Sequence, residues 1–248
     1  MFLFQHLQGL EKRTMISLLN ARARGPFTSL DNLMERLSLS IEQLDILIRV
    51  DACRSFGKHK RSLLWEAHFK CNHMVVNNQQ KQLFKVNIAD FDLPNFTSTN
   101  LETAFDHLEL LSFTLYSPFI LLENSPTNRL LNKDLKNHVN TVVVIYGYLV
   151  TAKNTTTSKG DRMHFGTFLD QDGDWIDTVH FPPIAKKYPF RGKGVYRITG
   201  KVVSEFDFLS VEVCKLERMS YVSDPRFDST YNRKELPEEM VKPFKLLR

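Results

Sequence analysis

The chain has 248 residues, of which 42% are hydrophobic and 25% charged, and 19 of them are Phe. A mainly disordered chain is excluded, because this apolar content is enough for one or two packed cores. No run of about 18 uncharged apolar residues occurs, so no membrane-spanning helix is expected. With no signal peptide in the apolar start at Met1, the expected location is cytoplasmic.

Charge and cysteine usage narrow the class further. The formal net charge is only +5, but the stretch between Thr178 and Ser204 has six basic residues and no acidic one. Such a one-signed segment attracts polyanions. The three cysteines, Cys53, Cys71 and Cys214, have no CxxC spacing, so we expect buried thiols and neither a disulfide framework nor a metal site.

The first 72 residues predict a group of short helices, because apolar residues recur there at spacings of three and four. Thr28 or Ser29 is expected to cap the helix that follows the turn at Gly25, and Ser40 with Gln43 has the spacing of a capping box. A basic connector over 54–61 precedes a helix predicted around 63–69.

Residues 73–138 are predicted to be a linker, because the apolar residues of its first part show no period. The linker contains one short helix with Leu101, Phe105, Leu108 and Leu111 on its apolar face, and Ser112 marks the end of that pattern.

From residue 139 the period changes to that of β-strands. Strands are predicted over 142–150, 162–169, 175–181, 194–204 and 209–216, with a short helix over 182–188. Asp172 and Gly173 suit the turn between the second and third strands. Five strands with a helix between the third and fourth are typical of an OB-fold barrel. The predicted class is α+β, with a helical region, this barrel over 139–219 and a polar tail over 220–248.

Several segments together resemble one family, the C-terminal region of the bacterial DNA polymerase III alpha subunit. The segments over 25–33, 47–53 and 57–64 are similar to its tandem helix-hairpin-helix region, and 159–173 is similar to the opening of its OB domain. The stretch 109–113 resembles the sequence that precedes that domain. Asp51 stands where the hairpin normally has Gly, and Ser112 replaces a second Gly. The family's polymerase core lies upstream of the segments matched here.

The resemblance implies a clamp-binding peptide. Gln80-Lys-Gln-Leu-Phe84 fits the QxxLF pattern by which that family docks on the sliding clamp. In such a peptide Leu83 and Phe84 would fill an apolar pocket, and Gln80 would make a polar contact at the rim. The alternative is that both apolar residues pack on the helical region.

Nucleic-acid contacts are expected in both modules. A hairpin between helices binds phosphate through backbone N–H groups and nearby cations, which would be Arg54, Lys58, Lys60 and Arg61. An OB barrel combines cations with stacking aromatic rings. The barrel candidates are Lys153, Lys159, Arg162, Lys201, Tyr148 and Phe206. Tyr146, Phe165, Phe168 and Trp175 are further rings, most of which the core must use.

No catalytic centre, cofactor motif or metal site is evident. Asp170, Asp172 and Asp174 begin like a calcium loop, but Trp175 and Phe181 stand where such a loop needs Gly and Glu. The sequence therefore predicts a non-catalytic chain whose partners are single-stranded DNA, a sliding clamp and other replicative polymerase subunits, without a membrane. The alternative is a stand-alone OB-fold adaptor that binds proteins. A metal-dependent enzyme, built on carboxylates that only the fold brings together, is the third class.

Overall fold

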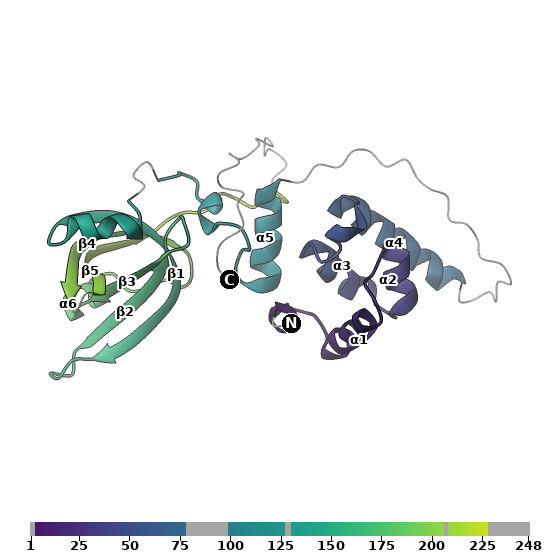
Figure 1. The fold of residues 1–248 in the computed structure, drawn as a ribbon, viewed down its shortest axis with the longest axis horizontal. Helices are drawn as coiled ribbons and strands as arrows, with labels where there is room; N and C mark the ends of the chain where they lie inside the picture. Colours follow the sequence, from purple (N-terminus) through teal and green to yellow (C-terminus); the bar gives the residue numbers. More distant parts are fainter. Residues whose placement is uncertain (1–2, 78–98, 127–129, 206–207, 228–248) are drawn as a thin grey trace. The chain divides into compact units, whose positions relative to one another are not determined.

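The computed structural model describes residues 3–77, 99–126, 130–205 and 208–227. The chain divides into two compact units, Met1–Thr114 and Leu115–Arg248 (Figure 1). The first unit is helical and the second is a β-barrel, as the sequence predicts. The helix expected inside a linker belongs to the first unit, so the linker predicted over 73–138 is not one continuous stretch.

The helical unit consists of short helices with turn signals between them. In chain order its elements are η1 (Leu3–His6), α1 (Lys12–Ala23), α2 (Leu30–Arg36), α3 (Ile41–Arg49), η2 (Arg54–Phe56), α4 (Lys60–Asn77) and α5 (Asn100–Leu111). Leu33, Leu44, Leu47 and Leu63 are buried in its core. Helix α4 is longer than the predicted 63–69 at both ends.

Of the two predicted helix caps, one is present and the other is not. Ser29 caps α2 by accepting a hydrogen bond from the Asn32 N–H at 3.1 Å, as predicted. The capping box at Ser40 is wrong, because the Ser40 side chain makes no cap bond. Gln43 is buried and instead joins the segment before α1, accepting from the Glu11 N–H and donating to the Gly9 carbonyl, both at 2.8 Å.

The second unit begins with two 3₁₀ helices, and its five strands then form a closed barrel in the order β1-β2-β3-β5-β4. The elements are η3 (Pro118–Leu121), η4 (Asn132–His138), β1 (Val142–Thr156), β2 (Arg162–Leu169), β3 (Trp175–His180), α6 (Pro182–Lys187), β4 (Val195–Glu205) and β5 (Phe208–Arg218). Helix α6 lies between β3 and β4, as predicted. This order of strands and helix is that of the OB-fold.

Alternating residues of all five strands fill the barrel. Ile145, Phe168, Ile176, Ile198 and Val211 are among its fully buried side chains. Two glycines allow the strands to close on one another. A Cβ atom at Gly200 would lie 2.4 Å from the Glu212 carbonyl oxygen, and one at Gly147 would lie 2.7 Å from the Cβ of Phe168. Neither position accepts a side chain without displacing its neighbour.

Candidate nucleic-acid interface

The outer face of β1, β2 and β3 carries a row of three cross-strand neighbours. Lys153 pairs with Phe165, and Phe165 pairs with Val179. Directly opposed residues of antiparallel strands point to the same face, so a cation, an aromatic ring and an aliphatic side chain lie side by side. Lys153 is exposed and Phe165 is 41% exposed. This row has the two chemistries that a single-stranded nucleic acid requires.

Trp175 adds a second exposed ring at the beginning of β3, where it is 50% exposed. It lies four residues from Val179 along the strand, so the two exposed rings are separated by about 13 Å. At that separation Phe165 and Trp175 do not stack on each other. Each ring is therefore exposed independently of the other.

The predicted cations of the first loop lie together on the two-stranded ribbon that the end of β1 forms with the start of β2. Strand β1 continues to Thr156, six residues beyond the predicted end, and pairs with β2 down to Arg162. The ribbon projects past the body of the barrel at the lower left of Figure 1. Lys153, Lys159 and Arg162 are all exposed on it. Asp161 is its one acidic residue.

Tyr148 does not join this surface, and its prediction as a DNA-binding residue is corrected. The side chain is 8% exposed and packs with Phe119, Leu122 and Val195. Burial raises the pKa of its phenol. The apolar run that begins at Pro118 covers this part of β1.

Two predicted residues lie at the other strands. Lys201 pairs with Val142 on β1 and with Glu212 on β5, so its cross-strand neighbours are an aliphatic side chain and an acid. It is not part of the row that contains Lys153 and Phe165. Phe206 lies outside the described residues. Phe208, at the start of β5, is 60% exposed and is the ring that the structure places at this loop. Phe208 belongs to the predicted loop, but the predicted stacking ring of that loop was Phe206.

In the helical unit, three of the four predicted cations are used in ion pairs. Lys60 donates to Asp106 at 2.6 Å, Arg61 to Glu102 at 2.9 Å and Lys58 to Glu66 at 2.8 Å. The side chains of Lys60 and Asp106 are 9% and 8% exposed. The prediction that Lys60 contacts DNA is therefore corrected, because Lys60 belongs to an internal ion-pair network. Arg61 and Lys58, which were also predicted to contact DNA, each already have a carboxylate partner. Arg54 is exposed.

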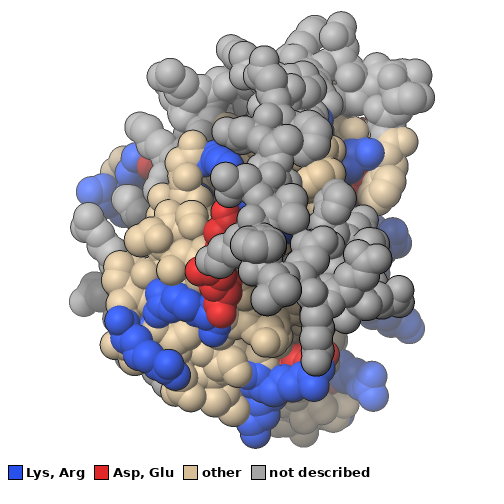
Figure 2. Space-filling view, turned by 90° about the vertical axis from the view of Figure 1, so that its right-hand side faces the viewer, with Lys and Arg blue, Asp and Glu red and all other residues tan. Residues whose placement is uncertain are grey.

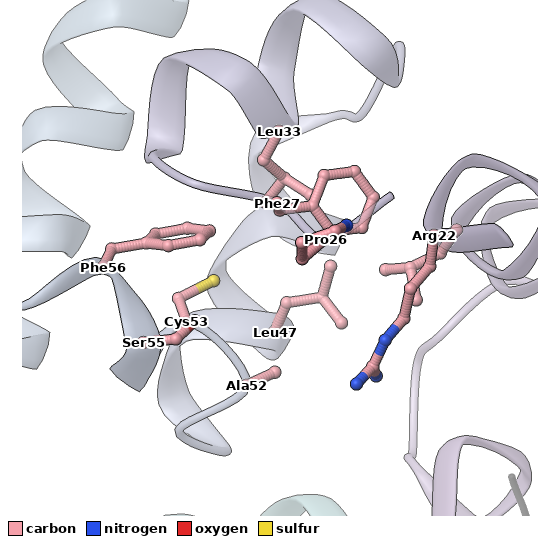
Figure 3. A pocket seen from close by; sticks show the side chains of 10 residues that line it. Arg22, Pro26, Phe27, Leu33, Leu47, Ala52, Cys53, Ser55 and Phe56 are labelled. Carbon is pink, nitrogen blue, oxygen red and sulfur yellow. The ribbon is translucent and has the colours of Figure 1, made fainter. Parts of the chain in front are cut away.

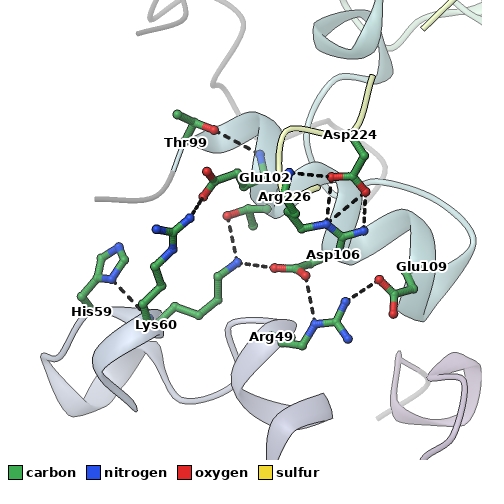
Figure 4. A network of polar contacts seen from close by, with 11 residues as sticks. Arg49, His59, Lys60, Thr99, Glu102, Asp106, Glu109, Asp224 and Arg226 are labelled. Carbon is green, nitrogen blue, oxygen red and sulfur yellow. Dashed lines mark hydrogen bonds and ion pairs between the residues drawn. The ribbon is translucent and has the colours of Figure 1, made fainter. Parts of the chain in front are cut away.

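Helix α5 supplies most of these acidic partners from one face. Glu102, Asp106 and Glu109 follow one another at helical spacing, and Asp106 and Glu109 both accept from Arg49 (Figure 4). Their partners come from α3 and the start of α4. The charge of the predicted hairpin is thus balanced within the unit.

The hairpin itself contains a further acid. Asp51 has a φ of 60°, the left-handed conformation that the resemblance assigns to Gly. Burial raises the pKa of its carboxyl, against the opposing effect of Lys60. A phosphate placed at this turn would meet the Asp51 carboxyl.

The charge distribution over the outside agrees with this balance. On the face that Figure 2 displays, acidic side chains lie among the Lys and Arg side chains. This face does not present a field of one sign.

A hollow of about 130 Å³ opens beside the hairpin (Figure 3). Phe27, Leu47, Cys53 and Phe56 line it, with Arg22 at its side. Burial raises the pKa of the Cys53 thiol to about 11, so the sulfur stays protonated at neutral pH and is a poor nucleophile. Cys53 is buried as expected, whereas Cys214 is exposed, contrary to that expectation.

The acidic turn between β2 and β3 has a structural explanation. Asp170 is fully buried and accepts hydrogen bonds from the N–H groups of Asn132, Asp172 and Asp174 at 2.8 to 2.9 Å. Gly173 has the predicted positive φ, at 86°. Within the described ranges no three His, Cys, Asp or Glu side chains are grouped to hold a metal ion. Nor does any helix in those ranges have the length and apolar content to cross a membrane.

The fold defines a chain with two modules, a unit of short helices and a closed barrel with the strand order of an OB-fold. A sequence model of the helix-hairpin-helix motif matches residues 1–63. Over 60 residues the chain is 33% identical to an error-prone DNA polymerase of Ralstonia pickettii (strain 12J), a match that covers 24% of this chain and 6% of that protein.

Among solved structures, the second OB-fold domain of replication protein A from Methanococcus maripaludis is similar at a TM-score of 0.26 and 14% identity, over 34% of this chain and 89% of that one. The predicted combination of a helix-hairpin-helix motif, polymerase similarity and an OB barrel is thus confirmed, with the barrel identified by its own strand order.

Proposed function

We propose that this chain is a non-catalytic DNA-binding and clamp-tethering portion of a replicative DNA polymerase alpha subunit, and that its barrel binds single-stranded DNA. The observation that carries the proposal is the exposed pair of Lys153 and Phe165 on the outer face of β1 and β2, with Trp175 beyond it.

The two kinds of side chain have different roles. An exposed ring that stacks on a base contributes about 1–3 kcal/mol and accepts any base. A cation contributes through the release of counterions from phosphate, so its contribution falls as salt rises. With rings at Phe165 and Trp175, a cation beside them at Lys153 and two more along the ribbon at Lys159 and Arg162, the barrel fits a strand of any sequence.

The barrel carries more of the proposed DNA binding than the helical unit does. The hairpin cations Lys60 and Arg61 already have carboxylate partners, and Asp51 adds a negative charge at the turn. A phosphate would have to displace those carboxylates. Lys153, Lys159 and Arg162 have no carboxylate partner among the ion pairs of the described residues.

Tethering is proposed on the peptide with Gln80, Leu83 and Phe84, which lies outside the described residues. Its support is the QxxLF pattern and its place in the sequence between α4 and α5. Through it the chain would hold the polymerase on its sliding clamp, in company with other replicative subunits.

Charge removal and ring removal test the barrel site separately. Changing Lys153, Lys159 and Arg162 to Ala should lower the salt slope of strand binding by about 2, because each lost phosphate contact removes about 0.7. Phe165→Ala should weaken binding by about 5-fold to 150-fold, the equivalent of 1–3 kcal/mol, with the slope unchanged.

The matched control changes three cations of the same unit that lie off the ribbon, Lys133, Lys136 and Lys215, to Ala. Unchanged affinity in the ribbon and ring variants, or an equal loss in the control, would place the site elsewhere. Salt-insensitive binding of proteins alone would favour the adaptor function instead.

A further inference from the structure

A second group of cations on the barrel is separate from the ribbon. It lies on α6 and on the segment between α6 and β4, where all four cations are exposed: Lys186, Lys187, Arg191 and Lys193. We call these four residues the α6 patch. None of them forms an ion pair with the acids of the described residues. They are part of the stretch between Thr178 and Ser204 that has no acidic residue at all.

The backbone under the patch is fixed by side chains of the barrel. The Tyr196 hydroxyl accepts from the Arg191 N–H at 2.9 Å and donates to the Gly192 carbonyl at 2.7 Å. The Arg218 guanidinium donates to the Lys193 carbonyl at 3.0 Å. Gly192 has a φ of 80°, which allows the turn between them.

Phe190 anchors the same segment from the inside. Its ring lies 4.8 Å from that of His180 and 5.9 Å from that of His164, and it also contacts Phe168 and Tyr196. The backbone next to Phe190 is therefore held in place, while the charged groups of Arg191 and Lys193 extend into solvent. Cations presented in this way lose little entropy of the main chain when they bind a ligand.

The chemistry of the patch favours a phosphodiester backbone. Lys187 lies over the Tyr188 ring at 5.3 Å, and Tyr188 is half-buried. The exposed ring of Phe181 belongs to the N-cap of α6, at the opposite end of that helix from Lys186 and Lys187, so the patch itself offers no ring to a base. A closed barrel has no free strand edge for adding a peptide strand. Four cations without a ring or an apolar anchor fit contact with phosphate alone.

Phe190, which anchors the segment of the patch, packs on the face of β2 that is opposite to the stacking row of Lys153, Phe165 and Val179. Side chains alternate along β2, so His164, which contacts Phe190, points to the opposite face from Phe165. Arg162 lies two residues before His164 on β2, so its side chain points to the same face as that of His164. A strand stacked on Phe165 would therefore have to cross from one face of β2 to the other before it reached the patch.

We propose that the α6 patch is a second, base-independent site for the phosphodiester backbone of a nucleic acid, occupied when a strand bound at the stacking row is long enough to continue past the ribbon. This inference rests on the proposed strand binding. It predicts that affinity depends on strand length.

The test uses the full chain and two oligothymidylates, one of about 8 nucleotides and one of about 32, twice the largest site of a single OB-fold. The variant K186Q/K187Q/R191Q/K193Q removes four charges and leaves the backbone hydrogen bonds in place. Its control, K133Q/K136Q/R197Q/K215Q, removes the same charge from elsewhere on the unit. Thermal melting verifies that both variants are folded.

For the long strand, the patch variant should bind at least about tenfold more weakly at low salt, and its salt slope should fall by about 2 to 3. For the short strand, affinity should equal that of the unaltered chain. Equal binding of the long strand by variant and unaltered chain, or an equal loss in the control, would overturn the second site. Polyglutamate that binds the patch as tightly as the long strand would overturn the choice of phosphodiester. If the unaltered chain binds neither strand, the proposed function itself fails.

Discussion

Replacing Asp106 by Asn tests whether the cations of the hairpin are held by α5. The Asp106 carboxylate accepts from Lys60 at 2.6 Å and from Arg49 at 3.0 Å. Burial alone would raise its pKa, but Lys60 and Arg49 outweigh burial and hold the pKa below its ordinary value. Asp106→Asn would leave the Lys60 ammonium, whose side chain is 9% exposed, without its charged partner.

The expected cost follows from that burial. Removing one member of a buried ion pair costs about 3–5 kcal/mol, because the other charge stays in a poorly hydrated site. Glu109 offers a matched comparison, since it pairs with the same Arg49 but its side chain is 49% exposed. Glu109→Gln should therefore cost less than about 1 kcal/mol.

The two tryptophans allow each unit to be followed separately. Trp65 lies in α4 and Trp175 in β3, so in a Trp175→Phe background the fluorescence reports the helical unit alone. With an m-value of about 1.5 kcal/mol/M, Asp106→Asn should lower the urea midpoint by about 2 to 3 M. Lys60→Met added to that variant should recover much of the loss, because the stranded charge is gone.

A midpoint for Asp106→Asn within about 0.5 M of the unaltered chain, or equal to that of Glu109→Gln, would contradict the buried ion pair between Lys60 and Asp106. It would show that the network is not buried in solution and that Lys60 is open to other partners.

Two further predictions concern the barrel and the peptide. Burial lowers the pKa of His180 from 6.5 to about 4, so the barrel should lose up to about 3 kcal/mol as pH falls through that range, because the unfolded chain takes up the proton first. Urea unfolding followed by Trp175 fluorescence measures this loss. His180→Gln should flatten the dependence, and a flat profile in the unaltered chain would contradict it. Changing Leu83 and Phe84 to Ala should abolish sliding-clamp binding in a pull-down while strand binding persists; clamp binding that survived the change would remove the peptide hypothesis.

The hydrogen bonds of His180 show which of its ring nitrogens would take up a second proton at low pH. Thr178 donates its hydroxyl proton to the Gly166 carbonyl, so in the hydrogen bond between the Thr178 Oγ1 and the His180 Nε2 the ring nitrogen is the donor. The Nδ1 atom is then the site for a second proton. Among the described residues that buried atom has no hydrogen-bond partner.

The sequence predicted the features that local pattern controls. Alternation in the segment around Ile145 and the turn at Gly173 gave the strands and their order along the chain, and Ser29 gave a helix cap. The extension of β1 to Thr156 was missed, because its last residues are exposed on both faces and show no alternation.

The features that were wrong depend on contacts distant in sequence. Tyr148 is covered by Phe119 and Leu122, which precede it by more than twenty residues. Lys60 is neutralised by Asp106, and nothing in the run of basic residues around Lys60 indicates that an acidic helix face would pack there. Burial and pairing of this kind become visible only in the fold.

The proposed function requires that the barrel binds a single strand through charge and stacking. A fluorescence-anisotropy titration of a labelled oligothymidylate with the full chain at two salt concentrations measures both the affinity and its dependence on salt. Binding that weakens with salt by a slope of at least about 2, as three contacted phosphates require, is the predicted result. Absence of binding at the lower salt concentration, or an affinity that salt does not change, would contradict it.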